Sequence, residues 1–403
     1  MKGNTMKKLS ITAILFLALV MISVSCTPTD TTAKIEELEE KITKLEEEKG
    51  QEQVAEETKT SETIDEEEIS SEEAVEEGPK EFSPNIIGSL YISGYTASVH
   101  VVEDYAYVGG QGLSVIDITD KAKPIVVGSS STSGWAQNFY IEGDFAYLPF
   151  EEYDSSGNST GGGFQIIDIT DKSAPVVMGT FESEDAIAGI SVVDNYIYAI
   201  YNIWEEMEEN SRRLTGSGIK IIDMTDKANL TVVGEFDGGS SGISSIYTEG
   251  DYAYIFAGGN FVILDITDRK NPTTKGGLSV SGWAQNFCIE GDFAYLPSGN
   301  TLQIIDLADK TNPVVLGGAF TKGDISAVSV FGDYAYITYL VRDDAGNPKE
   351  SGMQVIDILE KSAPVIIASA DIPGEALGIF VEGDYVYVAA GPVGLHILNL
   401  YAD

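Results

Sequence analysis

The chain of 403 residues carries 64 acidic and 24 basic side chains, which gives a formal net charge of −40 at pH 7. A surface this acidic repels the phosphates of nucleic acids and anionic lipid headgroups, which argues against nucleic acid as a partner. Cys26 and Cys288 are the only cysteines, so a disulfide-rich scaffold is excluded, and the chain is long enough to bury a large apolar core instead.

Residues 1–25 have the pattern of an export signal. A basic pair at 7–8 precedes an apolar run at 11–22, which is shorter than the roughly 20 residues of a membrane-spanning helix. The small residues that lead to Cys26 resemble the end of a bacterial lipoprotein signal, with Ser23 where that signal usually has leucine. The resemblance implies that Cys26 is lipidated and anchors an extracytoplasmic protein at the cell surface or in the periplasm. The alternative is an ordinary cleaved signal peptide in which Cys26 has no special role.

Between Cys26 and the repeated part of the chain, the composition indicates a tether. A short anchor segment, 26–32, leads into residues 33–50, where apolar residues recur at the a and d positions of about two heptads. This pattern predicts a short coiled-coil-like helix that acts as a spacer, with weak self-association as the alternative, because so short a helix is marginally stable in water. Residues 51–81 contain thirteen acidic residues and two lysines, the composition of a disordered, self-repelling linker.

Internal repetition dominates residues 82–403. The strings at 133–149 and 281–297 are identical except for Tyr140 in the first and Cys288 in the second. A relaxed form of the string, a turn residue followed by aromatic-x-Tyr, begins at Asp104, Asp144, Asn195, Asp251, Asp292, Asp333 and Asp384. Repetition of this kind indicates one domain built from seven similar units.

Each unit predicts four short β-strands. In the unit around Asp292, we expect strands at 284–289, 293–296, 302–307 and 314–320. The glycine before the turn residue provides the positive φ that a tight hairpin needs. Short strands with regular turn signals indicate an all-β fold.

The third strand recurs in every unit, as SVIDIT, QIIDIT, KIIDMT, VILDIT, QIIDLA, QVIDIL and HILNLY. Together with the Tyr-Ala-Tyr strings and a later Pro-x-Val-Val-x-Gly, these motifs resemble the LVIVD-repeat family of bacterial and archaeal surface proteins, which form β-propellers. The resemblance covers residues 82–403 and implies that fold. The sequence departs from the pattern at Asn195 and Asn399, which replace aspartate, and at Leu230, which replaces proline.

The ends of the repeated region indicate how the ring closes. The last unit contains three strand patterns, and residues 84–90 carry the fourth-strand pattern ahead of the first unit. We therefore expect an all-β, seven-bladed β-propeller of four-stranded blades, closed by an N-terminal strand that leaves no open edge. A pair of β-sandwiches is the alternative, but it does not require a permuted strand.

Three insertions interrupt the same connection in different units. They lie between the second and third strands, at 149–163, 199–218 and 338–352. Antiparallel strand order places this connection at one end of every blade. The insertions should therefore rise from one face of the propeller, where repeat scaffolds commonly carry variable function.

Distinctive side chains are expected at that same face. At the start of the first strand, and two or three positions further along it, some units have aromatic, amide or acidic residues where the other units have small or apolar ones. The third tryptophan lies in the second insertion. The ligand-binding candidates are Tyr95, Trp135, Gln137, Asn138, Trp204, Trp283, Gln285, Asn286, Asp324 and Glu375. Packing between blades is the alternative role for Trp135 and Trp283.

Other polar residues point to structure rather than chemistry. The third-strand aspartates recur in register with turn residues, which predicts hydrogen bonds to the turn backbone instead of a carboxylate ring. His100 and His396 lie in different units, and neither has a second His or a Cys near it that would complete a metal site. Cys288 is interpreted as an apolar core residue. The loops 154–158 and 343–347 have oxygen donors at loosely calcium-like spacing but lack the EF-hand pattern. No metal or cofactor is assigned, and calcium stays open.

These features predict a membrane-anchored binding or protein-interaction module that recognises a protein or a glycan through the face with the insertions. The propeller itself is expected to be monomeric, with the lipid anchor as its only membrane contact. No catalytic residue is assigned. The alternatives are a hydrolase or lyase on glycans, which would use Asp324 and Glu375 with tryptophans as sugar platforms, and a structural cell-surface subunit.

Overall fold

The computed structural model describes residues 81–401, apart from 133–137, 154–158, 208–211 and 281–285. The chain divides into two units, Met1–Glu76 and Glu77–Asp403, and every described residue belongs to the second. The expected signal, anchor, spacer helix and linker therefore lie outside the described residues, except for Glu81. Within the described part all regular structure is β, and no helix there is long and apolar enough to cross a membrane.

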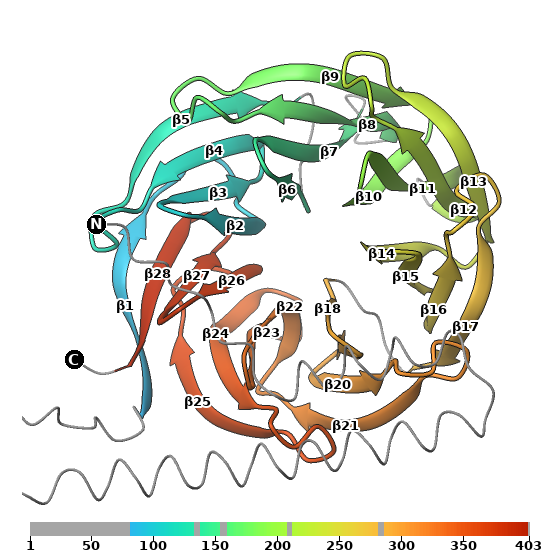
Figure 1. The fold of residues 1–403 in the computed structure, drawn as a ribbon. Helices are drawn as coiled ribbons and strands as arrows, with labels where there is room; N and C mark the ends of the chain where they lie inside the picture. Colours follow the sequence, from blue (N-terminus) through green and yellow to red (C-terminus); the bar gives the residue numbers. More distant parts are fainter. Residues whose placement is uncertain (1–80, 133–137, 154–158, 208–211, 281–285, 402–403) are drawn as a thin grey trace, which may run out of the picture. The chain divides into compact units, whose positions relative to one another are not determined.

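Seven four-stranded antiparallel sheets form the blades of a β-propeller, which confirms the predicted fold (Figure 1). The first strand of each blade is innermost: β2 (Ser98–Val102), β6 (Tyr140–Glu142), β10 (Ala186–Val193), β14 (Ile243–Glu249), β18 (Cys288–Glu290), β22 (Asp324–Phe331) and β26 (Gly378–Glu382). The second strands are β3 (Tyr105–Gly109), β7 (Phe145–Tyr153), β11 (Tyr196–Glu206), β15 (Tyr252–Ala257), β19 (Phe293–Ser298), β23 (Tyr334–Arg342) and β27 (Tyr385–Ala389).

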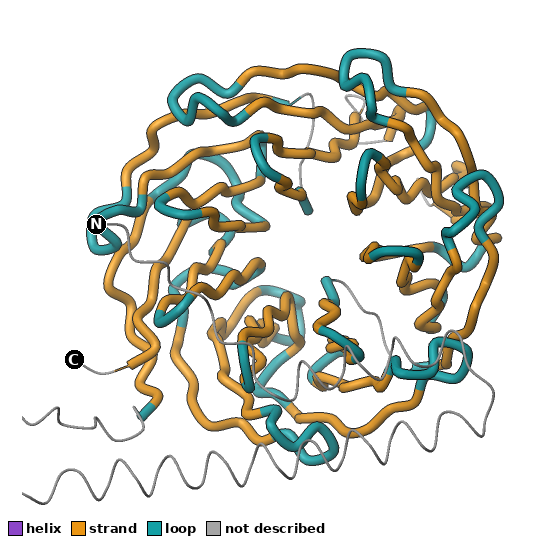
Figure 2. The backbone as a smooth tube through the Cα atoms, in the orientation of Figure 1, coloured by secondary structure: helices purple, strands orange, loops and turns teal. Residues whose placement is uncertain are grey.

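The outer half of each blade is built from the third and fourth strands, joined by short loops (Figure 2). The third strands are β4 (Gly112–Asp117), β8 (Ser159–Asp168), β12 (Arg212–Asp223), β16 (Asn260–Asp265), β20 (Thr301–Asp306), β24 (Pro348–Asp357) and β28 (Leu395–Tyr401). The outermost strands are β5 (Ile125–Ser131), β9 (Val176–Ser183), β13 (Thr231–Gly239), β17 (Thr273–Ser279), β21 (Val314–Phe320), β25 (Val365–Asp371) and β1 (Phe82–Leu90).

The apolar core lies between blades. Seven hydrophobic clusters each combine side chains of two adjacent blades, one cluster for every blade interface. The second aromatic of each aromatic-x-Tyr string is at most 2% exposed in all units: Tyr107, Tyr147, Tyr198, Tyr254, Tyr295, Tyr336 and Tyr387. Burial of such large side chains is the main favourable term for the ring, and each tyrosine is buried in the interface with the blade that follows its own.

A cation at the rim covers six of these interfaces. In six blades, the turn after the third strand contains an acidic residue followed by a basic one, which is Arg269 in the fourth blade and lysine in the others. The basic side chain lies over the first aromatic residue of the aromatic-x-Tyr string in the preceding blade, 4.5 to 5.8 Å from the ring centroid. The pairs are Lys121–Tyr385, Lys172–Tyr105, Lys227–Phe145, Arg269–Tyr196, Lys310–Tyr252 and Lys361–Phe293. Each contact of this kind is worth about 0.5–1 kcal/mol where it is exposed.

The seventh interface, between the sixth and seventh blades, uses the N-terminal strand instead. There the ring of Phe82 lies 4.7 Å from the ring of Tyr334 and 5.0 Å from that of Tyr401. β1 pairs with β28 from Phe82↔Tyr401 to Leu90↔Leu395, which confirms the predicted closure by an N-terminal strand. One aromatic side chain thus takes the place that a cation holds at the other six interfaces.

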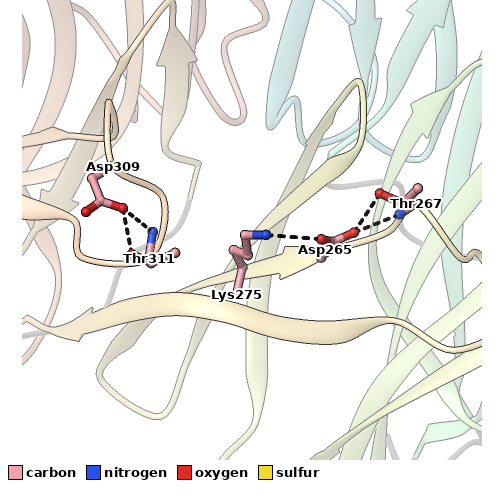
Figure 3. A network of polar contacts seen from close by, with 5 residues as sticks. All are labelled: Asp265, Thr267, Lys275, Asp309 and Thr311. Carbon is pink, nitrogen blue, oxygen red and sulfur yellow. Dashed lines mark hydrogen bonds and ion pairs between the residues drawn. The ribbon is translucent and has the colours of Figure 1, made fainter.

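The recurring third-strand aspartates have the predicted structural role. Each accepts a backbone N–H from two residues further on, as Asp265 does from Thr267 at 3.1 Å. Figure 3 shows this contact, the Thr267 hydroxyl that donates to the same carboxylate, Lys275 beside it, and a different turn of the fifth blade in which Asp309 accepts from Thr311. The bonds from Thr267 lower the pKa of Asp265, which keeps this carboxylate ionised as a turn acceptor.

Two expectations about strand limits change. The first strand of the fifth blade was expected at 284–289, but its described part begins at Cys288, because Asn286 has a φ of +55° that is incompatible with a strand. In the insertions at 199–218 and 338–352, the described residues continue the strands of the hairpins β11–β12 and β23–β24, as far as Glu206 and Arg342 on the second strands. The hairpin β7–β8 extends in the same way.

Replacing Phe82 with alanine is expected to lower the free energy of unfolding by about 1–3 kcal/mol, because it removes a partly buried aromatic from the closing interface. Phe320→Ala is the matched control, since Phe320 also lies on an outermost strand but is 78% exposed. The control should change stability by less than about 0.5 kcal/mol. Chemical denaturation measures both, and equal losses in the two variants would contradict the closing role of Phe82.

The hairpin between the first and second strands provides a test of backbone strain. Its left-handed position holds glycine in five blades, but Glu103 (φ +55°) and Asp194 (φ +56°) in the other two. Glu103→Gly should raise the free energy of unfolding by about 0.5–1 kcal/mol, because it relieves a conformation that side chains disfavour. Gly250→Ala should lower it by about 1 kcal/mol, since the added Cβ meets nothing within 4 Å and only strain is introduced. Thermal melts check the opposite signs, and shifts of the same sign would refute the interpretation.

Candidate ligand-binding cavity

A cavity of about 520 Å³ opens at one end of the central axis. All seven blades contribute to its lining: Tyr95, Ala97, Asn138, Pro149, Glu151, Tyr153, Ile187, Ala188, Asn202, Trp204, Leu214, Gly242, Ile243, Ser244, Asn286, Asp324, Ile325, Ser326, Leu340, Arg342 and Leu377. Its volume is in the range of sites that take small organic molecules.

Strand direction explains why these residues meet. The lining comes from the starts of first strands and the ends of second strands, which lie at the same end of an antiparallel blade. The three extended hairpins rise at this end too, since they continue the second and third strands past the length of the other blades. The cavity and the hairpins therefore share one face of the propeller.

The hairpins present alternate residues of their second strands to the cavity. Seven positions after the turn residue stand Glu151, Asn202 and Leu340, and nine positions after it stand Tyr153, Trp204 and Arg342. Positions two apart share one face of a strand, so both sets point the same way. Equivalent places in three blades thus offer six different side chains to one cavity.

Trp204 and Tyr153 give the cavity accessible aromatic surface. Trp204 is 46% exposed and pairs with Leu214 across the hairpin, next to a register shift between Ile203 and Trp204. The extra residue of this bulge is Thr215 on β12, so the alternation of side chains along β11 continues through Trp204. Tyr153 is 48% exposed at the end of β7. Both aromatic side chains are therefore accessible to a molecule in the cavity.

Tyr95 connects the cavity to the closing blade. Its hydroxyl donates a hydrogen bond of 3.0 Å to Oε2 of Glu375. Burial, then the bond to Glu375, raises the pKa of Tyr95 to about 12, while the positive charge of Arg342 acts in the opposite direction. Tyr95 therefore stays protonated at physiological pH and holds the Glu375 carboxylate.

Amide side chains join neighbouring blades around the cavity. Asn202 Nδ2 lies 3.4 Å from the carbonyl oxygen of Ile243, and Asn286 Nδ2 lies 3.4 Å from that of Ser326. These are long hydrogen bonds. An asparagine amide has two N–H donors and a carbonyl acceptor, so one such bond does not exhaust its capacity.

The predicted site residues fall into three groups. Five of the ten candidates line the cavity: Tyr95, Asn138, Trp204, Asn286 and Asp324. Glu375 contacts it through Tyr95. Trp135, Gln137, Trp283 and Gln285 lie outside the described residues. Sequence reasoning missed Glu151, Asn202 and Arg342, although counting from the turn residue aligns Arg342 with Trp204, and Glu151 with Asn202 two positions earlier.

The remaining polar candidates have structural surroundings. Asp343 accepts the backbone N–H groups of Ala345 and Asn347 at 2.9 and 2.8 Å, which closes the tip of the sixth-blade hairpin. Across the described ranges no group of three His, Cys, Asp or Glu side chains could hold a metal ion. His100 packs on Phe380 at 4.6 Å between ring centroids, and burial lowers the pKa of His100 to about 4. The loop 154–158 lies outside the described residues.

The seven blades and their shared cavity define a β-propeller repeat protein. The chain belongs to the LVIVD repeat family, whose repeat matches residues 93–132, 133–183, 242–279, 281–321, 322–371 and 373–399, more than half of the chain. The structure is also similar to the crystal structure of the computationally designed Ika8 protein, at a TM-score of 0.54 and 10% identity over 79% of this chain and 99% of that one. That similarity supports the fold alone. No curated protein sequence matches the chain.

The third blade lies outside the matched segments yet has the same four strands. Its turn residue is Asn195 instead of aspartate, and its carbonyl oxygen accepts the N–H of Met224 at 2.9 Å. Asp104 accepts the N–H of Ile118 in the same way in the first blade. The side chain is free to change here because the recurring hydrogen bond uses the main chain.

Proposed function

We propose that this protein is a binding module whose ligand or partner group enters the central cavity on the hairpin face. The observation that carries the proposal is the joint lining of the cavity by all seven blades. A β-propeller repeat fold is consistent with an interaction module, and the non-repeating side chains gather at this cavity. A rigid ring holds such side chains in place before the ligand arrives, which reduces the entropy lost on binding.

We propose further that the module is displayed outside the cytoplasmic membrane on a lipid attached to Cys26. The support is the sequence pattern of residues 1–25, with its short apolar run before a cysteine. The acidic segment 51–81 would then act as the spacer between anchor and propeller, since like charges extend a linker.

Binding is favoured over hydrolysis of glycans. A general acid at neutral pH usually needs a carboxyl group in an apolar, desolvated setting. Asp324 is exposed at the rim, and Glu375 accepts a hydrogen bond from Tyr95. A structural role as a cell-surface subunit would leave the cavity without a use.

Cys26→Ser is expected to move the protein from the membrane fraction to the soluble fraction, because the thiol is the only proposed attachment point. Cys288→Ser is the control, since Cys288 lies on β18 within the propeller and should leave the distribution unchanged. Fractionation followed by immunoblotting measures both. Retention of Cys26→Ser on membranes would contradict the lipid anchor.

Ala188→Trp is expected to abolish binding of whatever co-purifies with the wild-type chain, because Ala188 is an exposed residue of the cavity wall and an indole there fills the site. Ala228→Trp is the matched control: Ala228 is exposed in a turn after β12 and does not line the cavity. Affinity isolation from cell-envelope extract, compared across the three proteins at equal melting temperature, measures the effect. Retained binding by Ala188→Trp would contradict the cavity as the binding site.

A further inference from the structure

We infer that the cavity recognises a short neutral oligosaccharide. This inference rests on the proposed function, since it names the ligand class of the same cavity. Three properties of the lining carry it: the kinds of hydrogen-bonding group, the aromatic surfaces and the balance of charge.

Most polar groups of the lining can both donate and accept hydrogen bonds. They are the amides of Asn138 and Asn286 and the hydroxyls of Ser244 and Ser326, contributed by four blades. Asn202 lines the cavity from a fifth blade, but its Oδ1 is buried, so this amide offers a ligand only its Nδ2 donor. Asp324 and Glu151 only accept, and Arg342 only donates. A sugar hydroxyl is at once a donor and an acceptor, so a ligand rich in hydroxyls matches a lining of mixed groups. A phosphate needs donors alone, and an ammonium group needs acceptors alone.

The aromatic side chains lie on neighbouring blades around one opening. Tyr95 is on the first blade, Tyr153 on the hairpin of the second, and Trp204 on the hairpin of the third. Pyranose rings have one face of C–H groups, which packs on aromatic rings while the hydroxyl groups point outward to polar partners. A series of aromatic residues along one rim suits several linked sugar units better than one isolated group.

The charge balance disfavours ionic ligands. Arg342 lines the same cavity as Glu151 and Asp324, and its guanidinium group donates to the carbonyl oxygen of Gly346 at 3.1 Å. An anion would meet two carboxylates in a chain of net charge −40. A cation would meet the guanidinium group of Arg342 as well as the two carboxylates, so the three charged groups leave a net charge of only −1 to attract it. An uncharged ligand avoids both conflicts and still uses Arg342 and the carboxylates as charged hydrogen-bond partners, which make stronger bonds than neutral ones.

The test is calorimetric titration of the full chain with defined probes. The neutral probes are linear tetrasaccharides of glucose, mannose, xylose and N-acetylglucosamine, each titrated at low and high salt. Tetragalacturonate is the anionic probe and tetralysine the cationic one. The variants are Trp204→Ala, which removes an aromatic surface, and Asn202→Leu, which removes an amide at nearly constant volume. Phe320→Ala is the control, because it removes an exposed aromatic outside the cavity.

We expect at least one neutral tetrasaccharide to bind, with affinity that changes little with salt. Trp204→Ala and Asn202→Leu should each weaken it by about tenfold, as the loss of one stacking surface or one good hydrogen bond does, and Phe320→Ala should not. Binding of tetralysine or tetragalacturonate instead, with the same sensitivity to variants, overturns the sugar class but retains the cavity as a binding site. Neutral binding that ignores both cavity variants overturns the inference and the proposed site together. If no neutral probe binds, the inference is overturned, and the comparison of Ala188→Trp with Ala228→Trp still decides the proposed function.

Discussion

The pairing of β1 with β28 is the constraint on which the rest of the structure depends. The strand at Phe82–Leu90 comes first in the described chain and completes the blade that comes last, so the two ends of the propeller are held by one antiparallel ladder. Every hydrophobic cluster of the core combines two blades. A ring opened at any interface would therefore expose two large apolar surfaces at once, and closure makes all seven interfaces mutually dependent.

The same constraint shapes the cavity. Because it is lined by residues from all seven blades, its geometry exists only in the closed ring. The hydrogen bond from Tyr95 to Glu375 joins the first blade to the seventh, the blade that β1 completes, and the bridge between Thr96 and Gly391 joins the same two blades. Closure and the candidate site are thus connected through one tyrosine. Packing between the blades, rather than a ligand, fixes the backbone that carries the side chains of the cavity.

Positions that recur in every unit were predictable from sequence, because a repeat exposes its own structural residues. The buried tyrosines, the turn aspartates and the closing strand all follow from register. Phe82 could not be assigned its role, since its contacts with Tyr334 and Tyr401 join residues from the two ends of the propeller sequence, and the contact with Tyr401 spans nearly its whole length. The left-handed conformation of Asn286 could not be predicted for a different reason. The sequence on both sides of Asn286 keeps the pattern of one continuous strand, although the backbone turns at this residue. Arg342 was missed because reasoning followed unusual residue types instead of the repeat position it shares with Trp204.

The contrast between repeated and unrepeated positions locates specificity within the fold. Where all blades need the same contact, the residue is nearly constant. Where the contact uses the main chain, as at Asn195, the same hydrogen bond forms with a different side chain. Tyr153, Trp204 and Arg342 follow neither rule. They occupy one repeat position on three extended hairpins, have three different chemistries, and all line the same cavity. Since folding requires no particular side chain at such accessible strand ends, the choice of residues there is left to what the cavity binds.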